Sequence, residues 1–261
     1  MDKRVAEVAG AIVEAVRKIL LDKRVTEAEY RAGVDYLTEV AQTRETALLL
    51  DVFLNSTIIE GKAQRSRTSA PAIQGPYFLE GAPVVEGVLK TYDTDDHKPL
   101  IISRYGALGH GRVASLALSS TCGTRRLMAC TAGSTTTSPW TTTAEKLVTD
   151  SQGNYRVRTT MPVPYQIPYE GPTGRLLGHL GSHTWRPAHV HFKVRKDGFE
   201  PLTTQYYFEG GKWVDDDCCH GVTPDLITPE TIEDGVRVMT LDFVIEREQA
   251  EQRKSATETV A

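Results

Sequence analysis

The sequence has few cysteines, no long apolar segment and no excess of positive charge. No apolar run approaches the roughly 18 residues that a bilayer span needs, and the N-terminus lacks the basic-then-apolar order of a signal peptide. The 30 Lys and Arg residues are outnumbered by 34 Asp and Glu, so the net charge of −4 leaves no surplus to neutralise a phosphate backbone. We therefore expect a cytoplasmic protein with no membrane span and no nucleic acid partner.

The four cysteines form neither a zinc-type CxxC pair nor a regular disulfide pattern, and two of them, Cys218 and Cys219, are adjacent. All four are therefore expected to be reduced thiols. With 261 residues, 40% of them hydrophobic and 25% charged, the composition is typical of a globular protein with one large domain, or one domain and an appendage.

Residues 1–65 show the patterns of α-helices. Apolar residues recur at intervals of three or four in the first predicted helix. A second helix is predicted after Thr26, because Thr26 and Glu29 match a capping box, and a third covers about residues 45–59. Each helix has an apolar face that another helix or a second copy of the chain must cover. The apolar residues of the first helix are Val5, Val8, Ala9, Ile12, Val16, Ile19 and Leu20.

From about residue 70 the pattern changes to short β-rich runs separated by Gly, Pro and Asp. Many short strands with regular turn signals indicate a β-sandwich or a barrel. The chain therefore divides into a helical region (1–65), a mainly β domain (66–250) and a C-terminal tail (251–261). The predicted strands include residues 155–159, 189–194, 203–208 and 236–245.

The sequence His189-Val190-His191 lies in one of the predicted strands. Successive side chains of a strand point to opposite faces, so the two imidazoles share a face and can close on one metal ion. Two histidines with purely structural hydrogen bonds fit the pattern about equally well. A cupin-type Fe(II) or Zn(II) site is a third interpretation, although Glu200, the nearest glutamate, is badly spaced for it.

Upstream, residues 161–172 contain four prolines around Tyr165. Prolines at this density fix φ and exclude a helix, which predicts a rigid extended loop. Such a loop suits a tyrosine that binds a metal, and it suits a structural role equally well.

Several separated motifs together resemble the intradiol ring-cleaving catechol dioxygenases. The resemblance is strongest to the catechol 1,2-dioxygenases, followed by the chlorocatechol and hydroxyquinol enzymes, and it covers the N-terminal helices and residues of about 70–103 and 146–245. It implies a β-sandwich catalytic domain behind a helical dimerisation region. The motifs are Gly75-Pro76-Tyr77-Phe78, Pro164-Tyr165-x-x-Pro168, Glu170-Gly171-Pro172-Thr173, Gly181-x-His183-x-x-Arg186-Pro187-Ala188-His189-Val190-His191 and Leu202-Thr203-Thr204-Gln205.

The resemblance implies one non-haem Fe(III) per chain and the cleavage of catechol with O2 to cis,cis-muconate. It assigns Tyr165, His189 and His191 as iron ligands. Arg186 and Gln205 join Tyr165 as catalytic residues, with Arg186 stabilising charge on the substrate. The implied substrate-binding residues are Leu50, Asp51, Leu54, Gly75, Pro76 and Tyr77.

Residues 215–220 are not predicted to bind a metal, and the predicted partners follow from the resemblance. We expect Asp215-Asp216-Asp217 to be a solvated turn and Cys218-Cys219-His220 to be packing. The resemblance also implies a homodimer formed through the N-terminal helices, with a phospholipid held in their apolar tunnel. Chlorocatechol or hydroxyquinol 1,2-dioxygenase activity and an inactive β-sandwich that lacks one iron ligand are the alternatives.

The segment 104–144 departs from the rest of the chain, because it contains no Asp, Glu or Lys. In the family it resembles, this region carries a D-x-W-H strand and a G-x-Y-S turn with a second tyrosinate, and neither motif is present here. Tyr105, the only tyrosine of the segment, lacks that context. With codon choices that these residues allow, reading Ser119–Glu145 one base out of frame gives both motifs, so we hypothesise a frame-shifted segment. Recovery of the tryptic peptide 113–125 as written would exclude this hypothesis.

Overall fold

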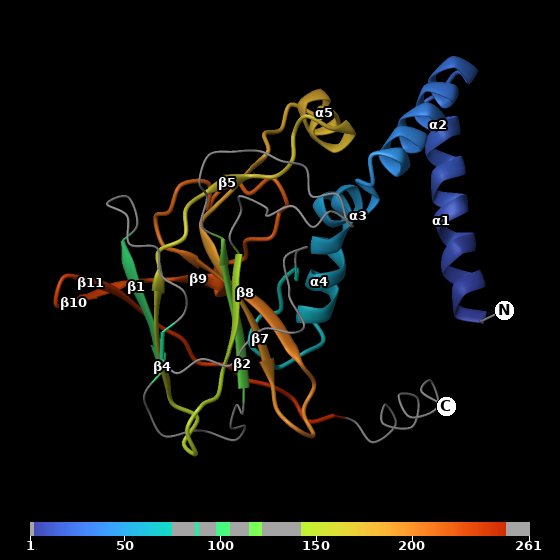
Figure 1. Ribbon diagram of the computed structural model, residues 1–261. Helices are drawn as coiled ribbons and strands as arrows, with labels where there is room; N and C mark the ends of the chain where they lie inside the picture. Colours follow the sequence, from blue (N-terminus) through green and yellow to red (C-terminus); the bar gives the residue numbers. More distant parts are fainter. Residues whose placement is uncertain (1–2, 75–86, 89–97, 105–114, 122–141, 249–261) are drawn as a thin grey trace. The chain divides into compact units, whose positions relative to one another are not determined.

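The computed structural model describes residues 3–74, 87–88, 98–104, 115–121 and 142–248 (Figure 1). The chain divides into two compact units, Met1–Thr46 and Ala47–Ala261. The third helical segment of the helical region predicted at 1–65 falls within the second unit.

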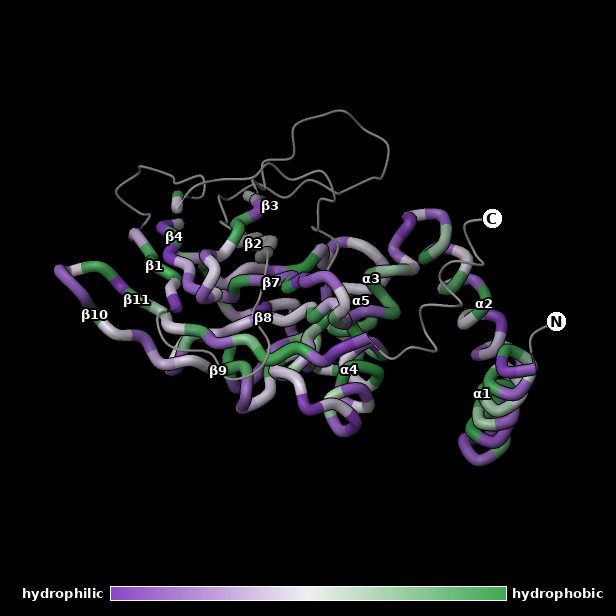
Figure 2. The backbone as a smooth tube through the Cα atoms, turned by 90° about the horizontal axis from the view of Figure 1, so that it is seen from below, coloured by the Kyte–Doolittle hydropathy of each residue, from purple (hydrophilic) through white to green (hydrophobic). Residues whose placement is uncertain are grey.

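The first unit contains helices α1 (Lys3–Asp22) and α2 (Glu27–Gln42). As predicted, α2 begins at a complete capping box, in which Thr26 and Glu29 each accept a hydrogen bond from the other's backbone N–H. Helix α1 buries none of its residues, and its apolar side chains are exposed. The tube through α1 accordingly changes between apolar and polar residues at short intervals (Figure 2).

The third helical segment consists of α3 (Thr46–Leu50), the π-helical turn η1 (Asp51–Asn55) and α4 (Ser56–Ala63). It confirms the helix predicted at 45–59, extends it and adds a wider turn in its middle. Val52 in this turn is buried in a cluster with residues of the β unit, which explains why the segment belongs to the second unit. Single π turns inside helices occur frequently at functional sites.

Two mixed sheets form the second unit, with strand orders β10-β11-β1-β4 and β3-β2-β7-β8-β9. The first contains β1 (Pro99–Arg104), β4 (Tyr155–Thr160), β10 (Thr231–Glu233) and β11 (Val236–Thr240). The second contains β2 (Ser115–Thr121), β3 (Thr142–Leu147), β7 (His189–Arg195), β8 (Leu202–Phe208) and β9 (Ile227–Thr228).

The main hydrophobic core lies between the two sheets. Alternate residues of β1 and β4, such as Ile102 and Val157, share one buried cluster with Val190 and Phe192 of β7. Because side chains alternate along a strand, each sheet contributes one face to this core. The mainly β sandwich with a helical N-terminal region is thereby confirmed.

The strand predicted at 236–245 ends at Thr240, but the following residues keep its alternation. Leu241, Phe243 and Ile245 remain in the core cluster, while Asp242 and Val244 are exposed. This segment is therefore extended and packed without belonging to a sheet ladder.

The anomalous segment still supplies a central strand. Strand β2 pairs with both β3 and β7, and Ser119 lies opposite His191 in the register. The regions 105–114 and 122–141, where the second tyrosinate of the family was sought, lie outside the described residues.

Short elements complete the second unit. The proline-rich loop contains a two-residue strand, β5 (Tyr165–Gln166), which pairs with β6 (Trp185–Arg186) and is followed by α5 (Pro172–His179). A 3-10 turn, η2 (Pro224–Leu226), precedes β9.

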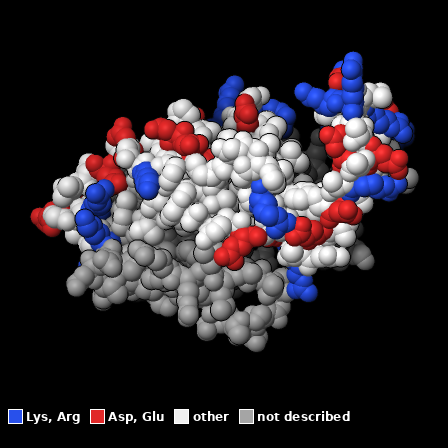
Figure 3. All heavy atoms as spheres, turned by 90° about the horizontal axis from the view of Figure 1, so that it is seen from above, with Lys and Arg blue, Asp and Glu red and all other residues white. Residues whose placement is uncertain are grey.

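In the described part of the chain, no helix combines the length and apolarity required to cross a bilayer. On the face seen in Figure 3, acidic and basic side chains are interspersed over the described surface.

Candidate functional site

The two histidines of β7 converge on one point. His189 and His191 are 1% and 8% exposed, and their Nε2 atoms are 3.1 Å apart. Val190 and Phe192 point to the opposite face, into the core between the sheets. The alternation of β7 therefore positions both imidazoles on the face turned away from that core, close enough for both to bind one ion.

Hydrogen bonding and burial favour the neutral form of both imidazoles, which is the form that can bind a metal ion. Nδ1 of His189 lies 2.8 Å from the carbonyl oxygen of Pro187, so it donates its proton there, and the lone pair of its Nε2 atom is directed toward Nε2 of His191. Burial, followed by the nearby positive charge of Arg186, lowers the pKa of His189 well below its usual value. Burial, His189 and Arg186 likewise hold the pKa of His191 well below its usual value.

His191 argues against a purely structural role for the pair. Its buried Nδ1 atom has no hydrogen-bond partner within the described part of the chain. A histidine that only packs would be expected to satisfy its ring nitrogens, because an unpaired buried polar atom costs free energy. Its Nε2 atom lies 3.1 Å from Nε2 of His189, a separation that two nitrogen atoms bound to one ion could also have.

Tyr165 supplies a phenol beside this pair. It is 7% exposed, its ring centroid lies 5.7 Å from that of His189, and it lies directly across the β5–β6 ladder from Arg186. One phenol and two neutral imidazoles form a donor set that suits Fe(III), since a hard ion prefers an anionic oxygen. The described residues at the site therefore fit the metal that the resemblance implies.

Arg186 is buried beside the site in an ion pair with Asp217. Its Nε atom donates to Oδ1 of Asp217 at 3.1 Å, and its Nη2 atom donates to Oδ2 at 3.0 Å. The two side chains are 3% and 2% exposed. Burial opposes the charge of Arg186, but Tyr207, Tyr165 and Asp217 favour it, and its pKa lies well above its usual value. The guanidinium is therefore a permanent positive charge held in a fixed orientation.

Gln205 and Tyr207 of β8 complete the polar cluster. In the β7–β8 ladder, His191 lies opposite Gln205 and His189 lies opposite Tyr207. The Tyr207 hydroxyl donates to Oε1 of Gln205 at 2.7 Å and accepts from Nη2 of Arg186 at 3.0 Å. The same face of two neighbouring strands thus brings together the imidazoles, Gln205 and Tyr207.

Asp217 corrects one prediction from the sequence. Asp215 and Asp216 are exposed as expected of a solvated turn, but Asp217 is 5% exposed and bound to Arg186. The sequence analysis missed both Asp217 and Tyr207 as site residues. The spacing of Gln205 and Tyr207 could have identified Tyr207, since residues two apart in a strand share a face. No local signal separates Asp217 from its two neighbours.

The structure describes only three of the six predicted substrate-binding residues, which are Leu50, Asp51 and Leu54. Leu50 and Leu54 are 49% and 57% exposed. Asp51 is half-buried, and burial raises its pKa, while a hydrogen bond from Asn55 opposes the rise. Their contact with substrate stays a prediction. Gly75, Pro76 and Tyr77 lie outside the described residues.

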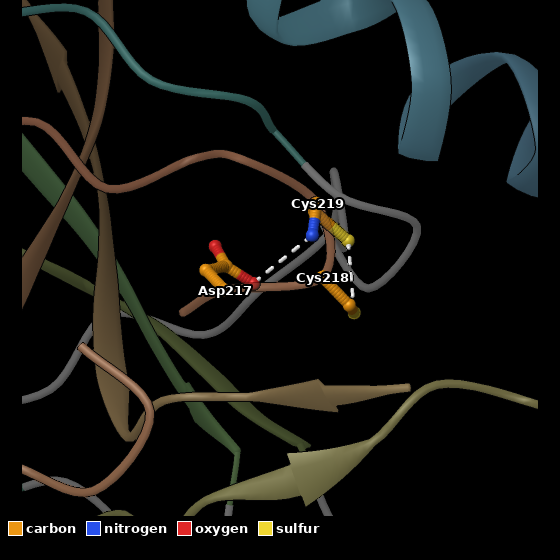
Figure 4. Close-up of side chains that lie close together, drawn as sticks. All are labelled: Asp217, Cys218 and Cys219. Atoms are coloured by element: carbon orange, nitrogen blue, oxygen red, sulfur yellow. Dashed lines mark hydrogen bonds between the residues drawn. The ribbon is translucent and has the colours of Figure 1, made fainter. Parts of the chain in front are cut away.

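Cys218 and Cys219 pack as predicted, whereas His220, predicted to pack with them, is exposed. Both cysteines are buried free thiols in a cluster with Tyr165 and Val52, and their sulfur atoms lie 3.8 Å apart. Asp217 lies beside them, and ligand atoms of the three residues are within 4.8 Å of one another (Figure 4). The Asp217 carboxylate, however, is already occupied by Arg186 and by backbone N–H groups, one of them from Cys219. This trio therefore serves as packing and as an anchor for Arg186.

Comparison with known proteins covers almost the whole chain. A family profile described as "Dioxygenase" matches residues 73–247, and one described as "Catechol dioxygenase N terminus" matches residues 2–70. A chlorocatechol 1,2-dioxygenase of Pseudomonas putida is 85% identical over 266 residues, with 100% of each chain covered. One from Pseudomonas sp. strain P51 is 56% identical, covering 95% of this chain and 98% of the relative.

A solved structure of a related enzyme has a similar fold. The crystal structure of chlorocatechol 1,2-dioxygenase from Pseudomonas putida matches with a TM-score of 0.85 and 83% sequence identity, covering 95% of this chain and 100% of that chain. The resemblance drawn from the motifs placed the catechol enzymes first and the chlorocatechol enzymes as an alternative. The names of these relatives favour that alternative.

Proposed function

Because this chain belongs to the intradiol dioxygenase family, we propose that it opens the ring of chlorinated catechols between their two hydroxyl-bearing carbons. Both atoms of O2 would enter the product, a chlorinated cis,cis-muconate, so the reaction needs no other oxidant or reductant. The proposal for the chlorinated substrate is supported by relatives at 85% and 56% identity that are named chlorocatechol 1,2-dioxygenases. Catechol itself and hydroxyquinol remain the substrates to compare.

We further propose that Tyr165, His189 and His191 hold one non-haem Fe(III) per chain. When bound, Fe(III) supplies a Lewis acid that binds the diol oxygens and draws electron density from them. Tyr165 would bind as a phenolate, because a coordinated acid loses its proton. The 3.1 Å separation of the two Nε2 atoms is the observation that carries this assignment.

Arg186 would stabilise negative charge that develops on the substrate ring. The proposal is supported by the pKa values of both imidazoles, which the positive charge of Arg186 helps to lower. A fixed charge in a buried, water-poor environment acts more strongly than one in solvent and needs no reorganisation during the reaction. Gln205 would support this role, because its Oε1 atom lies 3.3 Å from Nη2 of Arg186.

Oxygen uptake and product spectra test the proposed function. Purified protein should consume one O2 per molecule of 3-chlorocatechol or 4-chlorocatechol and yield the muconate spectrum, with kcat/KM for at least one of them above that for catechol. A yellow semialdehyde would instead indicate cleavage outside the two hydroxyl groups. Greater efficiency with catechol or hydroxyquinol than with both chlorocatechols would contradict the substrate assignment.

Colour and metal content test the iron site separately. A phenolate bound to Fe(III) absorbs visible light, so the protein should be red and contain one iron per chain. Tyr165→Phe should weaken the visible band, whereas Tyr169→Phe, a partly exposed tyrosine of the same loop, should leave it unchanged. A colourless, iron-free protein would favour the inactive β-sandwich, and an active but colourless enzyme would favour a cupin-like ferrous site.

We also propose that the chain forms a homodimer through its N-terminal helices. The support is the apolar stripe of α1, where Val5, Ile12 and Ile19 are 56%, 58% and 57% exposed. A stripe of this kind is typical of a helix that packs against a partner. A phospholipid between such helices is proposed from the family resemblance, and organic extraction followed by mass spectrometry would detect it.

A further inference from the structure

We propose that Asp217 and Tyr207 are positioning residues that aim Arg186 at the substrate, an inference that rests on the proposed function. Asp217 holds one edge of the guanidinium, and the Tyr207 hydroxyl and, at a longer distance, Oε1 of Gln205 accept the remaining N–H of Nη2. In the described part of the chain, Nη1 of Arg186 takes part in no hydrogen bond. This leaves Nη1 as the end of the guanidinium that meets the substrate.

The Asp217 carboxylate is saturated by four N–H donors. Its Oδ1 atom accepts from Nε of Arg186 at 3.1 Å and from the backbone N–H of Cys219 at 3.2 Å. Its Oδ2 atom accepts from Nη2 of Arg186 at 3.0 Å and from the backbone N–H of Gly221 at 3.1 Å. A carboxylate offers about four lone-pair sites, so this one can neither rotate nor accept another ligand without losing bonds.

Tyr207 and Gln205 form a second restraint on the same guanidinium. Tyr207 and Gln205 are both 0% exposed, and the Tyr207 hydroxyl bridges Nη2 of Arg186 and Oε1 of Gln205. The Nε2 atom of Gln205 in turn donates to the carbonyl oxygen of Ile73. Arg186 is therefore held from the loop that begins at Asp217 and from strand β8, two parts of the chain that meet only in the fold.

The backbone at Gly221 is shaped around this junction. A Cβ atom at this position would lie 3.0 Å from Nη2 of Arg186, 3.2 Å from Oδ2 of Asp217 and 3.2 Å from the Tyr207 hydroxyl. Contacts this close are tighter than ordinary van der Waals contacts, so a side chain here would have to displace its neighbours. The absence of one lets the Gly221 N–H reach Asp217, so the loop closes tightly on the ion pair.

The ion pair is better explained by positioning than by stability. Moving two charges out of water costs free energy that their attraction often fails to recover, and apolar residues of similar size frequently serve a core as well or better. A catalytic charge, in contrast, depends strongly on its location, since a displacement of about 1 Å can cost roughly a hundredfold in rate. The saturated carboxylate supplies that fixed location.

The test compares Asp217→Asn with Asp215→Asn, which removes the same charge from an exposed position two residues earlier. Asp217→Asn should lower kcat per bound iron by at least tenfold, with KM within about threefold, because the misdirected charge matters mainly in the transition state. Iron content and the visible band should stay at wild-type values. Asp215→Asn should stay within twofold of wild type in kcat and KM.

Tyr207→Phe provides a second variant that keeps the buried ring and removes only the hydroxyl. It should lower kcat per iron by at least threefold without loss of iron. Arg186→Leu provides the background that tests the mechanism, because Asp217→Asn should change turnover less than twofold when Arg186 is already absent. Equal losses from Asp217→Asn in both backgrounds would overturn the proposal.

The remaining outcomes separate this inference from the proposed function. If Asp217→Asn and Tyr207→Phe lose activity only in proportion to lost iron, their role is structural and the positioning proposal fails. If both retain wild-type kcat while the wild-type enzyme cleaves chlorocatechols, only the positioning proposal fails. If the wild-type protein cleaves no diol, the proposed function fails and the inference falls with it.

Discussion

At the scale of single residues, environment gives identical side chains different roles. Asp215 and Asp217 are two positions apart, yet one is exposed and the other forms a buried ion pair. Tyr155 and Tyr165 are both buried, but only Tyr165 lies beside the imidazoles. The residue type therefore limits the chemistry that a side chain can take part in. Its contacts decide which of two identical residues lies where that chemistry is possible.

The buried ion pair yields a stability prediction. Arg186→Leu should lower the free energy of unfolding by about 3–5 kcal/mol, because it leaves Asp217 buried without its partner. The double substitution Arg186→Leu with Asp217→Leu should recover most of that loss but none of the turnover. Denaturant unfolding and chlorocatechol turnover measure the two effects. Recovery of turnover in the double variant would contradict the role given to Arg186.

Tyr155 yields a pH prediction. Its hydroxyl donates to the carbonyl oxygen of Leu241 at 2.9 Å, and burial, followed by Tyr206 and Asp242, raises its pKa well above its usual value. Above about pH 10 the unfolded chain ionises this phenol and the folded chain does not, so unfolding releases a proton and stability falls as pH rises. This group contributes up to about 1.4 kcal/mol per pH unit.

Tyr155→Phe isolates that contribution. At pH 8 the variant should be about 1 kcal/mol less stable, because it lacks the hydrogen bond to Leu241. Between pH 10 and 11 its stability should fall less steeply than that of the wild type. Parallel curves from guanidinium unfolding over this range would show that the folded protein ionises Tyr155 as readily as the unfolded chain does.

At the scale of elements, short segments place the reactive groups. Strand β7 turns two histidines to one face, β8 adds Gln205 to that face, and the β5–β6 ladder brings Tyr165 opposite Arg186. Helix α5 follows the loop that carries Tyr165 and begins with Pro172 at its first turn, where a missing N–H costs nothing. Even a two-residue strand therefore positions a side chain at the site, because alternation and cross-strand register fix where that side chain points.

Two glycines of α5 offer a matched test of that loop. Gly174→Ala should destabilise the protein by about 1–3 kcal/mol, because its Cβ would clash with the backbone of Tyr169 in the preceding loop. Gly178→Ala in the same helix has open space and should stabilise it by about 0.5–1 kcal/mol. Thermal unfolding measures both changes.

Iron content extends this comparison to the site. The Gly174 variant should also bind less iron, since the displaced loop carries Tyr165, whereas the Gly178 variant should bind the wild-type amount. Wild-type iron content in a destabilised Gly174 variant would show that the Tyr165 loop adjusts independently of α5.

At the scale of the whole molecule, the two compact units differ in how far they bury their own apolar side chains. The β unit contains its own core between two sheets. Helix α1 buries none of its residues and leaves its apolar stripe exposed. The β unit thus buries its apolar side chains within one chain, whereas the apolar side chains of α1 stay exposed.

Substitution in α1 tests the expected dimer. Ile12→Asp should shift the protein from dimer to monomer in light scattering, because it places a charge in the apolar stripe. Ala11→Asp adds the same charge about 100° around the helix and should leave the dimer intact. A monomeric wild type, or equal effects of both variants, would contradict the N-terminal interface.

The amino-acid order alone determined the features that depend on neighbours in the chain. The capping box at Thr26, the alternation of His189 and His191 and the proline-stiffened approach to Tyr165 could all be predicted, because periodicity and capping act over a few residues. The family resemblance implied ring cleavage and the proposed roles of Arg186 and Gln205. Only the tertiary structure decided that Asp217, and not Asp215, anchors Arg186, and that the third helical segment joins the β unit. Those outcomes depend on burial and on contacts between distant segments, to which no local pattern corresponds.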